Sequence, residues 1–179
     1  MRIISGSHGG RKIAPPAHMP HTRPTTDIAK EGLFNILQNN LDITDLNTLD
    51  LFGGTGCISY ELASRGANEL TIVEKDSKMY EFIKNTSANL GFENIHVVKQ
   101  DVFSFIANCS KKYHFIFAGP PYALNTIDEL PKKIFEHDLL EKGGWFVLEH
   151  TPRNDYKKFD HYRTERNYGT TIFSIFIKK

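Results

Sequence analysis

The sequence predicts an α/β fold built on a mostly parallel, doubly wound sheet, with a C-terminal antiparallel hairpin and a small basic N-terminal extension. Five short apolar or β-rich runs lie between residues 46 and 149, and stretches with helical patterning separate the first four. After Pro152, residues 162–166 and 171–177 flank a turn at Tyr168-Gly169. Alternating strands and helices are typical of βαβ units, and a terminal hairpin closes one edge of the sheet.

The N-terminal segment reads as an extension of this sheet domain. Residues 3–4 and 12–14 flank a Gly-rich turn, which predicts a short hairpin, and prolines at 15, 16, 20 and 24 predict an extended linker. Thr26 or Asp27 then caps a helix whose apolar residues from Ile28 to Leu41 mostly share one face. We therefore divide the chain into an extension at 1–40 and a main domain at 41–179.

The main domain follows in order along the chain. We expect strands at 46–52, 70–74, 95–98, 113–118 and 145–149, and helices over 57–65, over 77–90 and from about Val102. No internal repeat interrupts this order.

Length and composition place limits on the class of protein. A chain of 179 residues, 40% hydrophobic and 24% charged, is typical of one packed domain. No apolar run reaches membrane-helix length and the first residues lack a signal-peptide core, so we expect a cytoplasmic monomer with no membrane partner. Cys57 and Cys109 are the two cysteines. Their spacing predicts neither a disulfide framework nor a metal site.

Charge is segregated along the chain. Residues 1–26 carry four basic side chains and no acidic one, and residues 152–179 carry seven basic against three acidic. The net charge is +1, so the middle must be about −7. Basic ends around an acidic body indicate a polyanion bound at one surface, although Lys and Arg at chain ends also simply improve solvation.

The ends of four predicted strands carry the residues suited to chemistry. In open α/β sheets, ligands bind beyond the carboxyl ends of the strands, so these segments share one rim. They are Asp50-Leu51-Phe52-Gly53-Gly54-Thr55-Gly56, Glu74-Lys75-Asp76, Gln100-Asp101-Val102 and Gly119-Pro120-Pro121-Tyr122.

Each segment has a ligand interpretation and a structural one. The glycines would let a ligand approach the backbone, or would only make a tight turn. Glu74 would accept hydrogen bonds from two ribose hydroxyls, or is a solvated charge at the end of a strand. Asp101 would accept a hydrogen bond from an adenine amine, or caps a helix. Together they predict an adenosine-containing ligand, either NAD or S-adenosylmethionine. A dinucleotide fingerprint starting at Gly54 requires glycine where Ser59 stands, which favours the cationic methyl donor.

Several motifs in order give a specific resemblance. Asp50 to Gly56 resembles the first motif of class I methyltransferases, and Ala118-Gly119-Pro120-Pro121-Tyr122 resembles their amino-methylating motif. The chain as a whole resembles the RsmD family of bacterial 16S ribosomal RNA guanine-N2 methyltransferases through further segments: 2–6, 11–12, 23–27, 33–37, 64–67, 73–76 and 168–171.

The resemblance implies a Rossmann-like fold, S-adenosylmethionine as cofactor and a role for each motif. Asp50, Phe52, Gly53, Gly54 and Gly56 would form the methionine end of the site. Glu74 with Lys75 would bind the ribose, and Asp101 with Val102 the adenine. Gly119, Pro120, Pro121 and Tyr122 would hold the guanine, with Tyr122 stacked on the base. The implied product is 16S ribosomal RNA methylated at one guanine N2, within an assembling small ribosomal subunit.

Gly119 departs from the family pattern. An Asp is expected before Pro120-Pro121-Tyr122, where it would accept the hydrogens of the guanine amine. Loss of one preorganised polar contact costs about 10²–10³ in rate, which predicts impaired catalysis. Three explanations stay open: an introduced change, replacement of the acceptor by another group or water, or a protein that binds without efficient turnover. On this basis Gly119→Asp should raise methyl transfer at least tenfold.

The basic N-terminal segment has an RNA-binding interpretation. Phosphate contacts would come from the extension, and the candidate residues are Arg2, Arg11, Lys12, Arg23 and Thr25. The principal alternative is a non-catalytic RNA-binding or ribosome-assembly protein that retains a cofactor pocket. A DNA adenine methyltransferase and an NAD-dependent oxidoreductase are further alternatives; the first would lack room for a DNA-recognition domain.

Overall fold

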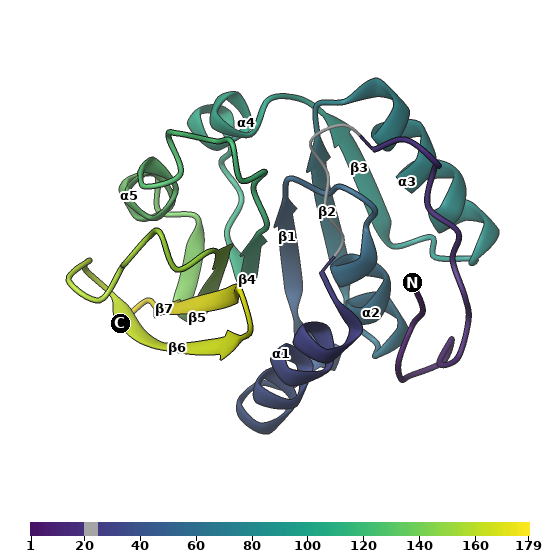
Figure 1. The fold of residues 1–179 in the computed structure, drawn as a ribbon, viewed down its shortest axis with the longest axis horizontal. Coiled ribbons are helices and arrows are strands. Elements are labelled where there is room, and N and C mark those ends of the chain that lie inside the picture. Colours follow the sequence, from purple (N-terminus) through teal and green to yellow (C-terminus); the bar gives the residue numbers. More distant parts are fainter. Residues whose placement is uncertain (20–24) are drawn as a thin grey trace.

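Seven strands form one sheet in the computed structural model, which describes residues 1–19 and 25–179 (Figure 1). The spatial order is β3-β2-β1-β4-β5-β7-β6. Neighbours from β3 to β5 pair in parallel, whereas β5–β7 and β7–β6 are antiparallel. The strands are β1 (Asn47–Leu51), β2 (Glu69–Glu74), β3 (Ile95–Lys99), β4 (Tyr113–Ala118), β5 (Leu140–His150), β6 (Tyr162–Tyr168) and β7 (Thr171–Ile177).

Helices cover both faces of the sheet, as the strand sequences require. Successive side chains of a strand point to opposite faces. In β4, Phe115 and Phe117 belong to the apolar cluster that contains α1, α2 and α3 residues, whereas Ile116 and Ala118 belong to the cluster with α4 and α5 residues. The helices are α1 (Asp27–Asn40), α2 (Cys57–Ser64), α3 (Ser77–Asn89), α4 (Val102–Asn108) and α5 (Glu129–Glu136), with a short 3₁₀ turn, η1 (Ile43–Asp45). The predicted mostly parallel α/β fold with its terminal hairpin is confirmed.

Side-chain caps fix where three helices begin. The hydroxyl of Thr26 accepts the Ala29 amide, and the carboxylates of Asp76 and Asp101 accept the amides of Met79 and Ser104. These bonds satisfy amides that lack a partner in the first turn. Within the described part of the chain, no helix has the length and apolarity to span a bilayer.

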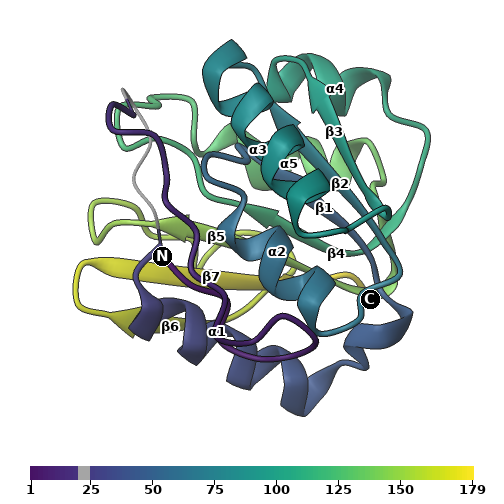
Figure 2. The same cartoon turned by 90° about the vertical axis from the view of Figure 1, so that its right-hand side faces the viewer.

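The N-terminal segment docks on α2 through a buried carboxylate. Glu61 accepts the amides of Ile4 at 2.8 Å and Ser5 at 3.1 Å, and its charge is balanced by Lys30 at 3.4 Å and Arg65 at 2.9 Å. A buried charge is tolerated only when it is paired and hydrogen-bonded in this way. The segment runs along the α2 side of the molecule in Figure 2. α1 and α2 side chains share one apolar cluster across the proposed division at residue 40, which itself stays a prediction.

The structure differs from the sequence-based expectation in four local details. The predicted N-terminal hairpin is reduced to one bridge, Arg2 to Lys12. β5 begins five residues earlier than predicted, with an irregular register against β4. α5 was not predicted, because Pro131 obscures its pattern; proline is tolerated there, in the first turn of a helix. Ile28 leaves the buried face of α1 and is 76% exposed.

Candidate active site

The candidate site lies at the carboxyl ends of the strands β1 to β5. β1 and β4 are neighbours in the sheet, and the chain runs outward from them in opposite directions, to β2 and β3 on one side and to β5 on the other. Ligands of open α/β sheets bind at such a switch point. A cavity of about 900 Å³ opens there. Its lining includes twelve of the thirteen predicted catalytic and cofactor-binding residues: Asp50, Phe52, Gly53, Gly54, Glu74, Lys75, Asp101, Val102, Gly119, Pro120, Pro121 and Tyr122.

The glycine-containing turn after β1 has two distinct reasons for its glycines. Gly54 and Gly56 have φ values of 58° and 82°, a left-handed backbone that favours glycine. Gly56 does not line the cavity but precedes α2 as its N-cap. Gly53 has no such backbone, and a Cβ there would collide with Cγ2 of Ile72. Close packing against β2 therefore explains Gly53, in addition to any ligand approach.

Asp50 is a buried carboxyl group at the end of β1. It is 3% exposed, and the Ser59 hydroxyl donates to its Oδ2 at 2.7 Å. Burial raises the pKa of Asp50 to about 8, and the nearby charges of Glu74 and Glu149 act in the same direction. A cation in the cavity would favour the ionised form and reduce this cost. The site is thus prepared for a positively charged ligand.

Glu74 organises the second side of the cavity. Its Oε2 accepts the Gly54 amide at 3.3 Å and its Oε1 accepts the Asp76 amide at 3.4 Å. Burial raises the pKa of Glu74, while these two backbone amides oppose the shift. Since each carboxylate oxygen can accept more than one hydrogen bond, Glu74 retains acceptor capacity toward a hydroxyl-bearing ligand.

Asp101 shows the capping geometry that was one of its two interpretations. Its Oδ2 accepts the Ser104 amide at 3.1 Å and begins α4. Asp101 also lines the cavity beside Val102 and Phe103, so capping and ligand contact are compatible. Its role toward adenine stays a prediction.

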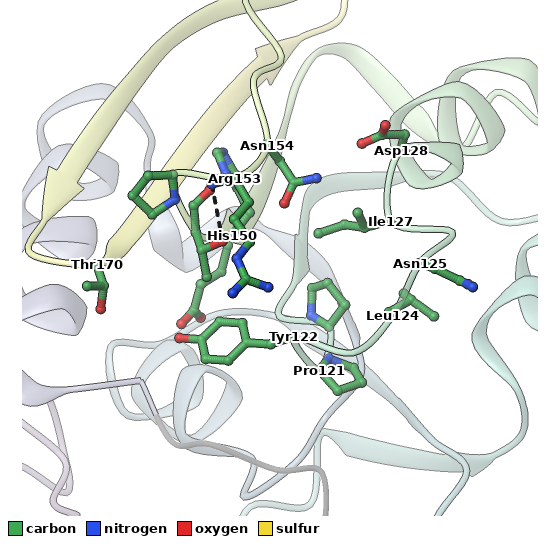
Figure 3. A pocket seen from close by; sticks show the side chains of 14 residues that line it. Pro121, Tyr122, Leu124, Asn125, Ile127, Asp128, His150, Arg153, Asn154 and Thr170 are labelled. Carbon is green, nitrogen blue, oxygen red and sulfur yellow. Dashed lines mark hydrogen bonds between the residues drawn. The ribbon is translucent and has the colours of Figure 1, made fainter.

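A second cavity of about 750 Å³ adjoins the first. Both are lined by Pro120, Pro121, Tyr122, Leu124 and Glu149, so the Pro-Pro-Tyr segment and Glu149 stand at their junction. Tyr122 is 51% exposed, and in Figure 3 the side chain of Arg153 extends towards it from the opposite wall. An exposed aromatic ring at the border of two cavities can stack on a planar ligand.

Glu149 was missed by the sequence analysis, and it contacts Thr25, one of the predicted residues. Glu149 lines both cavities and ends the predicted fifth strand, so the strand-end rule would have found it had it been applied to that strand. The hydroxyl of Thr25 donates to Oε2 of Glu149 at 2.8 Å, and Thr25 lines the larger cavity. Its predicted contact with RNA stays a prediction.

Among the described residues, the predicted RNA-binding side chains of Arg2, Arg11 and Lys12 do not line either cavity. Arg2 pairs with Asp27 at 3.3 Å, while Arg11 and Lys12 are exposed. The turn between Arg2 and Arg11 contacts Ser64 through the amides of Ser7 and His8. Ser64 lies at the end of α2 that is farther from the site. Arg23 lies outside the described residues. Binding of RNA by these side chains stays a prediction.

Comparisons with known proteins agree on a methyltransferase family. The profile of the family described as conserved hypothetical protein 95 matches residues 1–177. Ribosomal RNA small subunit methyltransferase D of Escherichia coli K12 is 34% identical over 149 residues, which cover 83% of this chain and 71% of that protein. YlbH of Bacillus subtilis, assigned as an rRNA methyltransferase, is also 34% identical, over 154 residues that cover 84% of this chain and 82% of that protein. The solved structure of yhhF from Escherichia coli, assigned as a methyltransferase, has a TM-score of 0.87 at 27% identity, with 100% and 98% covered.

Proposed function

The chain belongs to the RsmD family of rRNA methyltransferases, and on this premise we propose that it transfers a methyl group from S-adenosylmethionine to the N2 amine of one guanine in 16S ribosomal RNA. The observation that carries the proposal is the junction of two cavities at Pro120-Pro121-Tyr122. One cavity suits the donor and the other a flipped base, so donor and acceptor would meet at the segment that divides them.

The residues of the larger cavity fit S-adenosylmethionine. Asp50, Glu74 and Glu149 make it acidic, and burial already penalises the charge of Asp50, so a cationic sulfonium would be stabilised there. Glu74 would accept the ribose hydroxyls with the capacity left by its two amide contacts. Asp101 and Val102 would contact the adenine. When bound, S-adenosylmethionine supplies an electrophilic methyl carbon.

The smaller cavity supports a guanine acceptor. Enzymes that modify a base must take it out of the stack, and an exposed aromatic side chain can receive it. Tyr122 would stack on the guanine, and the carbonyl of Pro120 would accept an amine hydrogen. Holding donor carbon and acceptor nitrogen in line would account for much of the rate enhancement.

RNA would reach the site across basic surface. Arg2, Arg11, Lys12 and Arg23 would neutralise phosphates, and their number predicts a marked salt dependence. We place the reaction in the cytoplasm, on an assembling small subunit, with the protein acting as a monomer. Gly119 is the observation that favours the alternative, a non-catalytic RNA-binding protein with a retained cofactor pocket.

Two measurements test the proposal. Titration calorimetry should detect binding of S-adenosylmethionine and of S-adenosylhomocysteine, and no binding of NAD. Incubation with S-adenosylmethionine and unmethylated small-subunit particles, followed by nucleoside mass spectrometry, should yield N2-methylguanosine in 16S ribosomal RNA. Cofactor and RNA binding without any methylated nucleoside would favour the non-catalytic alternative. Methylation of adenine or of DNA would refute the proposed acceptor.

A further inference from the structure

Gly119 leaves a position in the site where a carboxylate is expected, and the structure shows what stands beside that position. A Cβ built on Gly119 would lie 3.4 Å from Oε2 of Glu149 and 3.1 Å from Cε1 of Phe117. β4 and β5 are parallel neighbours, with Ala118 opposite Leu148, so Gly119 and Glu149 are the next residues along the two strands. The carboxylate of Glu149 is thus within the reach of the missing side chain.

Glu149 is held where an acceptor for the guanine amine would be needed. It lines both cavities at their junction, next to Pro120, Pro121 and Tyr122. The Thr25 hydroxyl donates to its Oε2 at 2.8 Å, across 124 residues of sequence. A carboxylate can accept about four hydrogen bonds, so a bond from Thr25 is compatible with further bonds from a ligand.

We propose that Glu149 supplies from β5 the carboxylate that Gly119 does not supply from β4, and accepts the hydrogens of the guanine amine. This rests on the proposed function. Methyl transfer forms one N–C bond and breaks one S–C bond, whose electron pair stays on sulfur; the surplus proton of the amine passes to the Glu149 carboxylate and then to water. Thr25 is a positioning residue, since it acts through Glu149.

A set of single variants tests this assignment. Glu149→Ala removes the acceptor, and we expect kcat to fall about 10²–10³-fold, the usual effect of losing one preorganised polar contact. Glu149→Gln keeps the shape and an acceptor oxygen but not the charge, and its kcat should lie between those of Glu149→Ala and the unaltered protein. Glu141→Ala, an exposed glutamate at the other end of β5, is the matched control and should leave kcat unchanged.

Binding measurements separate this role from a structural one. Affinity for S-adenosylhomocysteine should change less than threefold in Glu149→Ala, whereas affinity for RNA in the presence of that product should fall severalfold. Thr25→Val removes the same Thr25–Glu149 hydrogen bond but leaves the carboxylate. If Glu149 only anchored Thr25, both variants would lose activity equally; the proposal requires Glu149→Ala to lose at least tenfold more.

A rescue experiment gives the sharpest outcome. Gly119→Asp in the Glu149→Ala background should restore kcat at least tenfold, because a carboxylate then returns to the same space. In the unaltered background it should not accelerate the reaction, since two like charges would compete for one position. The sequence alone predicted instead that Gly119→Asp raises methyl transfer at least tenfold in the unaltered protein. Two results would overturn the proposal. One is a tenfold gain in kcat when Gly119→Asp is introduced into the unaltered protein, and the other is a kcat for Glu149→Ala within threefold of that of the unaltered protein. Absence of methyl transfer by the unaltered protein would instead count against the proposed function.

Discussion

Replacement of Asp50 by Asn should stabilise the ligand-free protein in a pH-dependent way. Burial raises the pKa of Asp50 from 3.8 in the unfolded chain to about 8 in the folded one. Between these values the folded state holds one proton more than the unfolded state, so the stability contributed by this group is greatest at low pH and falls as pH rises. Asn carries no charge at any of these pH values and can still accept the Ser59 hydroxyl hydrogen.

The size of the effect follows from this proton difference. One bound proton corresponds to a slope of about 1.4 kcal/mol per pH unit. The difference in unfolding free energy between Asp50→Asn and the unaltered protein should therefore shift in favour of the variant by roughly 3 kcal/mol from pH 5 to pH 7. The slope is more robust than the absolute difference, because it is independent of how well the amide packs. Above the folded pKa of about 8 the gain should level off.

Urea denaturation at half-unit pH intervals measures this slope. Asp138→Asn is the matched control, because Lys112 and Lys178 lower the pKa of Asp138 to about 2. Its contribution to stability is lost only as pH falls below about 4, so its difference from the unaltered protein should be constant from pH 5 to pH 7. A constant difference for Asp50→Asn over the same range would refute the account of Asp50 as a buried group with a raised pKa.

Three further predictions concern ligands and packing. Binding of S-adenosylmethionine at pH 7 should release close to one proton from the unaltered protein and fewer from Asp50→Asn, measured by calorimetry in two buffers of different ionisation enthalpy; equal release would exclude Asp50 as the source. Joint replacement of Arg11 and Lys12 by Ala should weaken RNA binding and reduce the salt slope by about 2, with cofactor affinity unchanged; a parallel fall in both affinities would argue against separate sites. Gly53→Ala should cost about 1–3 kcal/mol of unfolding free energy, since its methyl group would meet Ile72; an unaltered denaturation midpoint would contradict this packing role.

Most strands could be predicted because their signal is local. The run at 113–118 coincides with β4, and the run at 171–177 with β7, since alternation of side chains between two buried faces is written into consecutive residues. The boundaries of β5 were less predictable. Its early residues contain two glycines and gain their place by pairing with distant segments, as Gly144 does with Lys178. No local pattern reports such a contact.

The candidate site divides in the same way. Residues at or just after the end of a strand were found by one rule, because parallel strands bring their carboxyl ends to a common edge. The rule located Asp50, Glu74 and Asp101, which line one cavity. It could not distinguish a glycine needed for a turn from one needed for packing, as at Gly53, because that depends on the side chain of Ile72 in the next strand.

The sequence by itself determined the class of fold, the edge of the sheet that carries the site and the family to which the chain belongs. Only the tertiary structure decided what surrounds each residue there. The deep burial of Asp50, the bond from Thr25 to Glu149 and the approach of Glu149 to Gly119 all join residues from separate elements. Hydrogen bonds and desolvation act over a few ångströms in space, whatever the separation along the chain, and so they are set by packing and not by local pattern.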